Sequence, residues 1–267
     1  MRVAGPLAVL AERQDAELAL QTLGTFAVYR DGSAVPGSAW QSRKARDLMK
    51  ILAARRGKTI TREALADLLW PDAAPDSAGN RLSVALSTAR SVLDPERDHP
   101  ADRFIVADRG AVRLDLRTVH LDVEDFAEHV RAALSAAGDG NDDAVRLLER
   151  AAAAYPGDFC EDDPYEVWAT QPRDELRALY HQVLRALART LAAADLPDAA
   201  VPWLITLLGA DPYDESTHLR LVRTLVRAGR HGDARRSYRT YTERMSEIDV
   251  EPAAFPQTRA SRAGDRR

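Results

Sequence analysis

Cysteine is almost missing from this sequence of 267 residues, with Cys160 as its single example. One thiol excludes a disulfide within the chain and a cluster of cysteine ligands for a metal ion. The six histidines are scattered, without an HExxH motif or other paired spacing, so no metal ion is predicted. These absences fit a reducing compartment, and we expect a cytoplasmic protein.

Long apolar runs and catalytic motifs are missing too. No run approaches the ~18 residues of a membrane helix. The short apolar run near the start is broken by Gly5 and Pro6, so a loose tail is expected there. The sequence has no nucleophile elbow or phosphate loop, and the adjacent Glu161, Asp162 and Asp163 cannot easily converge on one substrate. We therefore predict neither an enzyme nor a cofactor.

An excess of positive charge is the third absence, since the net charge is −4. The charge is unevenly distributed. Residues 20–116 carry 15 Lys and Arg against 12 Asp and Glu, and residues 117–267 carry 20 against 26. This asymmetry places any contact with phosphate in the first half and a protein-facing role in the second.

What is present begins with a small sheet and a helix. Residues 20–30 alternate between apolar and polar and meet the turn signal Asp31-Gly32, which predicts an antiparallel hairpin. Residues 43–56 have the helical period, and Gly57 is the expected C-cap. The polar face of this helix is basic, and its charges fit phosphate contact and a solvated helix face equally well. It consists of Arg43, Lys44, Arg46 and Lys50.

Two further helices are predicted over residues 61–70 and 78–93, joined by a polar loop that contains proline. In the second, leucines and an alanine form a narrow apolar stripe, and the opposite face carries small polar groups between Arg81 and Arg90. A helix that is buried along one side and exposes small polar groups on the other suits the major groove of DNA. Taken alone, it also fits an ordinary amphipathic surface helix.

A second hairpin follows these helices. Residues 104–107 and 111–114 flank an Asp108-Arg109-Gly110 turn. The order of sheet, three helices and hairpin is that of a winged helix-turn-helix with an extra N-terminal sheet. Arg109 would lie at the tip of the wing, near the minor groove. The order favours DNA binding over the ordinary surface helix.

From residue 117 onward strand signals fade and helix follows helix. Small residues and prolines recur at offsets typical of tetratricopeptide repeats, for example at Ala200, Pro212 and Ala234. Residues 158–168 interrupt the repeats as an irregular acidic connection. Its aromatic residues could mark a partner site, but we favour aromatics that dock onto helices and acids that are solvated.

The sequence thus predicts a mainly α protein in four parts. A flexible tail over 1–18 precedes a winged helix-turn-helix domain with small β-sheets over 19–116. An all-α tetratricopeptide-like bundle over 117–250 precedes a disordered, Pro- and Arg-rich tail over 251–267, whose arginines could add non-specific attraction to DNA.

Two blocks of the sequence together resemble a known family. LGTFAVYRDGSAVPG, KARDLMKILAARRGKTITREALADLLWPD and NRLSVALSTARSVLDP resemble the OmpR-type winged helix of the SARP-type transcriptional activators of actinobacteria. The residues from LDVEDFAEHV through YRTYTERM resemble the bacterial transcriptional activator domain that accompanies it. Large members continue into an ATPase module. No GxxxxGK[ST] motif occurs here, so we expect the short form.

The resemblance implies a nucleoid-associated regulator that binds double-stranded DNA at promoter repeats and contacts RNA polymerase through its sigma or alpha subunit. It leaves a homodimer open. The family's recognition helix ends in an Arg-rich run, where this sequence has Ser87-Thr88-Ala89-Arg90-Ser91. Fewer phosphate contacts predict modest affinity. The predicted contacts are Arg81, Ser83, Val84, Ser87, Thr88 and Arg90 at or beside base edges, Arg109 in the minor groove, and Arg43, Lys44 and Arg46 at the DNA backbone.

The poorly basic helix and the acidic second half support an alternative function. In this alternative the winged helix is a degenerate scaffold, and the repeat domain is an adaptor that binds a protein or a small ligand. DNA binding by the first half is our main prediction.

Overall fold

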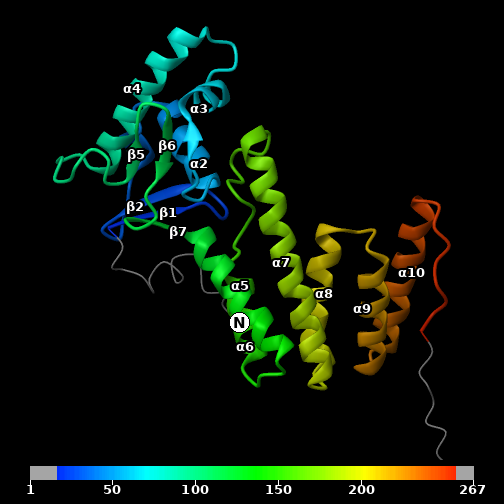
Figure 1. Ribbon diagram of the computed structural model, residues 1–267. Coiled ribbons are helices and arrows are strands. Elements are labelled where there is room, and N and C mark those ends of the chain that lie inside the picture. The colour runs from blue at the N-terminus through cyan, green and yellow to red at the C-terminus, as the bar shows by residue number, and fades with distance from the viewer. Residues whose placement is uncertain (1–16, 257–267) are drawn as a thin grey trace, which may run out of the picture. The chain divides into compact units, whose positions relative to one another are not determined.

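The computed structural model describes residues 17–256 and shows two compact units. Among the described residues, the first unit contains 17–131 together with 153–180, and the second contains 132–152 and 181–256. Helices predominate and the short strands lie in the first unit, as predicted (Figure 1). The first unit also includes segments beyond residue 116, where we placed the end of the winged helix-turn-helix domain.

A four-stranded sheet forms one part of the first unit, in the order β3-β2-β1-β7. The hairpin predicted around the Asp31-Gly32 turn is β2 with β3, and β1 pairs with β2 antiparallel. β7 lies parallel to β1, although we expected no strand after residue 116. The three residues of β7 are too few to show an alternation of apolar and polar side chains, so the strand is recognised only by its pairing with β1. The strands are β1 (Leu18–Gln21), β2 (Ala27–Arg30), β3 (Ser33–Ala34) and β7 (Val119–Leu121), and a short 3-10 turn, η2 (Gly37–Ala39), follows β3.

Three helices pack against one another beside this sheet: α2 (Arg43–Ala54), α3 (Arg62–Leu69) and α4 (Pro75–Leu93). α4 begins three residues earlier than predicted, because proline is well tolerated in the first turn of a helix, where its missing N–H costs nothing. The predicted apolar stripe of α4 faces inward. Its members Leu82, Leu86, Ala89 and Leu93 are all buried.

The predicted second hairpin is present as β5 (Ile105–Ala107) and β6 (Ala111–Leu114). A short strand, β4 (Ile60–Thr61), adds to it in the order β4-β6-β5. α2 ends at Ala54 with Arg55 as its C-cap, two residues before the predicted end at residue 56. Gly57, the predicted C-cap, lies instead in the turn that follows, where its φ is +74° and a Cβ would lie 2.9 Å from Leu116. Only glycine therefore suits this turn.

The second unit is helical throughout its described elements. α8 packs on α9 and α9 on α10, joined by short loops at residues 211–214 and 228–230. The small residues Ala200 and Ala234 are fully buried, as the repeat pattern predicted. The helices are α5 (Asp122–Gly138) and α7 (Val167–Ala193), which contribute to both units, and α6 (Ala144–Ala153), α8 (Pro197–Ala210), α9 (Glu215–Arg227) and α10 (His231–Glu247).

Residues 251–256 lie along α10, although we expected disorder from residue 251. Tyr238 donates its hydroxyl to the carbonyl oxygen of Ala253 at 2.9 Å, and the amide of Ala253 donates to Tyr241 Oη at 2.7 Å. The ring of Phe255 meets the ring of Tyr238 edge-on. An aromatic side chain in the segment thus provides an anchor that composition did not reveal. The predicted tails at residues 1–16 and 257–267 lie outside the described residues.

Candidate nucleic-acid interface

The exposed face of α4 carries five of the predicted contact residues together. Arg81, Ser83, Val84 and Ser87 are exposed and Thr88 is half-buried, while the opposite face of the helix packs against α2 and α3. Val84 is 66% exposed. α4 is therefore held by its back and presents small side chains outward, as the sequence predicted.

Hydroxyl groups on this face bond to their own helix. Ser83 Oγ donates to the carbonyl oxygen of Gly79 at 3.1 Å, and Thr88 Oγ1 donates to that of Val84 at 3.0 Å. Ser91 Oγ donates to that of Ser87 at 3.1 Å. Since each hydroxyl has a single hydrogen, these bonds leave the three oxygens to act as hydrogen-bond acceptors.

The β5–β6 hairpin places Arg109 at an exposed tip. Asp108 Oδ1 accepts from the amides of Gly110 at 2.9 Å and Ala111 at 2.7 Å, and these bonds lower the pKa of the Asp108 carboxyl. The amide of Arg62, the first residue of α3, donates to the carbonyl oxygen of Gly110 at 3.0 Å. The wing tip is thereby fixed beside the helices.

Arg62 is a member of this surface that the sequence interpretation missed. Its Nη2 donates to Ser83 Oγ at 3.0 Å, which brings a cation onto the exposed face of α4. The sequence does not indicate this contact, because Arg62 precedes Ser83 by 21 residues. The packing of α3 against α4 creates the proximity.

Arg90 does not point freely outward. Its Nη2 donates to the carbonyl oxygen of Ile105 in β5 at 3.0 Å, and burial lowers the pKa of its guanidinium. Its buried Nε has no hydrogen-bond partner among the described residues. We predicted that Arg90 reads or flanks base edges, whereas the structure gives its guanidinium a structural contact that joins α4 to the wing.

The basic face of α2 is also divided by the fold. Arg43 and Lys44 reach solvent in the first turn, each within 4.0 Å of the Asp47 carboxylate. Arg46 instead donates to the carbonyl oxygen of Phe26 at 2.9 Å and lies over the Phe26 ring. Of the three predicted backbone contacts, Arg46 is therefore held within the protein.

The acidic connection over residues 158–163, which we call the acidic loop, pairs with this face of α2. Lys50 is 2% exposed and forms ion pairs with Asp162, at 3.5 Å, and Asp163. Arg46 lies 3.6 Å from Asp162. Our interpretation that these acids are solvated is wrong for Asp163. Lys50 on α2 is buried and needs a negatively charged partner, and the fold brings Asp163 of the acidic loop to it.

Backbone bonds hold the acidic loop in place. The amide of Gly24 donates to the carbonyl oxygen of Asp158 at 2.8 Å, and the amide of Cys160 donates to that of Thr22 at 2.7 Å. From α7, Arg173 donates to four carbonyl oxygens of residues 159–164. The expectation that both aromatics dock onto helices fails for Tyr165, which is 95% exposed.

Two hollows flank the exposed face of α4. One is bounded by Ser83, Ser87 and Ser91 on the helix and by residues 97–105 before the wing. The other is bounded by Val84, Ser87 and Thr88 and by Arg30 of the first hairpin and residues 35–41 after it. The face of α4 thus stands between two recesses, a shape that leaves its side chains accessible to a large ligand.

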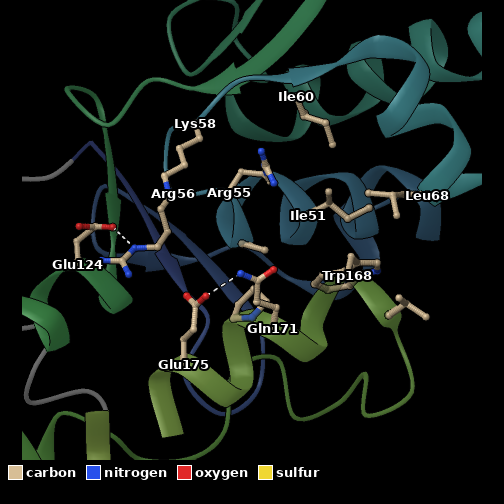
Figure 2. A pocket seen from close by; sticks show the side chains of 13 residues that line it. Ile51, Arg55, Arg56, Lys58, Ile60, Leu68, Glu124, Trp168, Gln171 and Glu175 are labelled. Carbon is tan, nitrogen blue, oxygen red and sulfur yellow. Dashed lines mark hydrogen bonds and ion pairs between the residues drawn. The ribbon is translucent and has the colours of Figure 1, made fainter. Parts of the chain in front are cut away.

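A third hollow in the first unit lies between the end of α2 and the start of α7 (Figure 2). Its sides carry both signs of charge. Arg56 pairs with Glu124, and Gln171 donates to Glu175 at 2.8 Å. Arg55 and Lys58 also line this hollow, so its charge is mixed, and it lies apart from the exposed face of α4.

Other classes of site are not evident in residues 17–256. No described helix is both long and apolar enough to cross a membrane. Over the same range, no three His, Cys, Asp or Glu side chains gather as a metal ion would require.

Comparison with known proteins gives the same two blocks. The family described as bacterial transcriptional activator domain matches residues 121–262, and the family described as transcriptional regulatory protein, C terminal, matches residues 39–111. The second match contains α2, α3, α4 and the wing turn.

Similar proteins include two from Streptomyces coelicolor. Transcriptional regulator RedD is 27% identical over 84% of this chain and 64% of its own length. Regulatory protein AfsR is 30% identical over 90% of this chain and 24% of its own length. The solved structure of Mycobacterium tuberculosis EmbR in complex with low affinity phosphopeptide has a TM-score of 0.76, covering 90% of this chain and 62% of that one. At 22% identity, this likeness shows the fold alone. The chain spans less than two thirds of each of these proteins.

Proposed function

The chain belongs to the SARP family of transcriptional regulators, and from this premise we propose that it binds promoter DNA through α4 and the β5–β6 wing. One observation carries the proposal: α4 is buried along its back and exposes a row of small side chains beside an exposed wing arginine. A recognition helix enters the major groove in this manner, and a wing reaches the neighbouring minor groove.

The arrangement divides the contacts into two kinds. Side chains of α4 between Arg81 and Thr88 face the base edges and carry sequence selectivity. Arg109, Arg62, Arg43 and Lys44 supply positive charge for phosphates or the minor groove, which sets affinity and its salt dependence. Arg46 and Arg90 stay in their structural contacts and support the surface from behind.

A matched pair of charge substitutions tests this surface. Ser87→Glu places a carboxylate where the phosphates and bases would lie, and Ser246→Glu makes the same change on an exposed position of α10. DNA fragments selected from a random pool by the wild-type protein serve as ligands in a binding assay at two salt concentrations. We expect Ser87→Glu to abolish binding and Ser246→Glu to preserve it. Equal binding by both variants would contradict the proposed surface.

We further propose that two copies occupy repeated promoter elements and that the helical second half contacts the sigma or alpha subunit of RNA polymerase. The name of the matched family, an activator domain, supports a role in activation. Transcription from a template with the selected repeats, with and without the protein, tests it. Spacing the repeats by half a helical turn, about 5 base pairs, should abolish activation if adjacent copies must bind one face of the DNA.

A further inference from the structure

The middle of α4 lacks the side chains that usually read bases. From Leu82 to Ala89 it contains no Arg, Lys, Asn, Gln, Asp or Glu. Bidentate recognition of guanine needs Arg or Lys, and that of adenine needs Asn or Gln. Two turns of the recognition helix are therefore unable to form either of these pairings.

Two of the hydroxyl groups in this segment already donate within the helix. Ser83 and Thr88 spend their hydrogens on carbonyl oxygens of the preceding turn, at 3.1 and 3.0 Å. In this arrangement their oxygens act as acceptors, and Ser83 Oγ already accepts from Arg62 Nη2 at 3.0 Å. In the major groove the exocyclic amino groups of adenine and cytosine are the donors. Hydrogen bonding of this kind distinguishes those two bases poorly from each other.

Val84 is the one large apolar side chain of α4 that is exposed, at 66%. It lies between Asn80 and Thr88 along the outward row of the helix, one turn from each. Of the four bases, only thymine presents a methyl group in the major groove, and apolar side chains recognise it by contact. The side chain of Val84 suits that group and offers no polar atom to any other base edge.

Resting on the proposed function, we infer that Val84 is a specificity-determining residue that reads the 5-methyl group of a thymine. Contact removes both apolar groups from water, so binding favours thymine at one position of the site. Burial of about one methyl group corresponds to an affinity difference of about fourfold.

Replacement of thymine by uracil isolates this contact, because uracil keeps the base-pairing edge and loses only the methyl group. Each thymine of a DNA site selected by the wild-type protein is replaced in turn. We expect one position at which uracil weakens binding about fourfold. Val84→Ala removes both γ-methyl groups that would reach the thymine, so the uracil penalty at that position should fall. Alanine favours the helix more than valine does, so the variant keeps its fold.

A control variant removes a comparable side chain elsewhere. Ile205 is an exposed aliphatic residue of α8, 56% exposed, and Ile205→Ala should keep the full uracil penalty. If the protein selects DNA but no thymine shows a penalty, or the full penalty persists in Val84→Ala, the inference is overturned while the proposed function stands. If no DNA is selected, the proposed function fails and the inference fails with it.

Discussion

The guanidinium of Arg90 in α4 donates to the carbonyl oxygen of Ile105, the first residue of strand β5, at 3.0 Å. This bond joins the recognition helix to the wing. It engages the one arginine of the Ser87–Ser91 segment in a contact within the protein, so the proposed DNA surface relies for positive charge on Arg81, Arg62, Arg43, Lys44 and Arg109.

Arg90→Ala tests that structural role. Loss of a charged donor to a carbonyl oxygen should lower the free energy of unfolding by about 1–2 kcal/mol. DNA affinity should fall by the same factor at every salt concentration, because no phosphate contact is lost. Urea unfolding and the salt slope of binding measure the two effects. A slope smaller by about 0.9 with unchanged stability would instead make Arg90 a phosphate contact.

Arg109→Ala should behave in the opposite way. The side chain is exposed at the wing tip, so its removal should leave the urea midpoint unchanged. If Arg109 meets a phosphate, the magnitude of the salt slope falls by about 0.9. Arg109→Lys keeps the charge and should restore the slope. An unchanged slope in Arg109→Ala would remove the wing tip from the interface.

Lys50→Met should destabilise the first unit strongly. Both Lys50 and Asp163 are buried, and the substitution leaves the carboxylate of Asp163 without its cation. An uncompensated buried charge costs about 3–5 kcal/mol. Adding Asp163→Asn removes that charge, so the double variant should recover much of the loss in urea unfolding. Equal instability of the single and double variants would show that packing, rather than charge, dominates.

Asp115 should make stability depend on pH in the acid range. Arg117 donates from Nε to Asp115 Oδ1 at 2.9 Å, and this side-chain bond lowers the pKa of Asp115 from 3.8 to about 2. Because the folded pKa is the lower one, the contribution is complete above about pH 4 and is lost as the pH falls through about 2.

The urea midpoint at successive pH values between those limits measures this loss. Asp115→Asn should flatten the profile over that interval. Asp67→Asn, at an exposed position of α3, serves as the control and should leave it unchanged. A profile that Asp115→Asn does not alter would assign the acid dependence to other carboxylates.

Much of the fold follows from local patterns in the chain. The apolar stripe of α4 predicted which side is buried, the Asp-Arg-Gly turn predicted the wing, and buried Ala200 and Ala234 confirm the repeat pattern. Each signal lies within a few residues or one helical period. β7 escaped prediction because its three residues acquire meaning only beside β1, about 100 positions earlier.

The sequence by itself determined the succession of three helices and a hairpin, the outward row of α4 and the position of Arg109 in the turn, because periodicity and turn chemistry act locally. Only the tertiary structure decided which Lys and Arg side chains stay exposed and which pair with groups of the protein itself. Arg46 and Lys50 share a helix face with Arg43 and Lys44, yet they meet Asp162 and Asp163 from the acidic loop. Arg90 likewise meets Ile105. A buried charge requires a partner wherever the fold brings one, and pairing between distant segments leaves no mark on the local pattern.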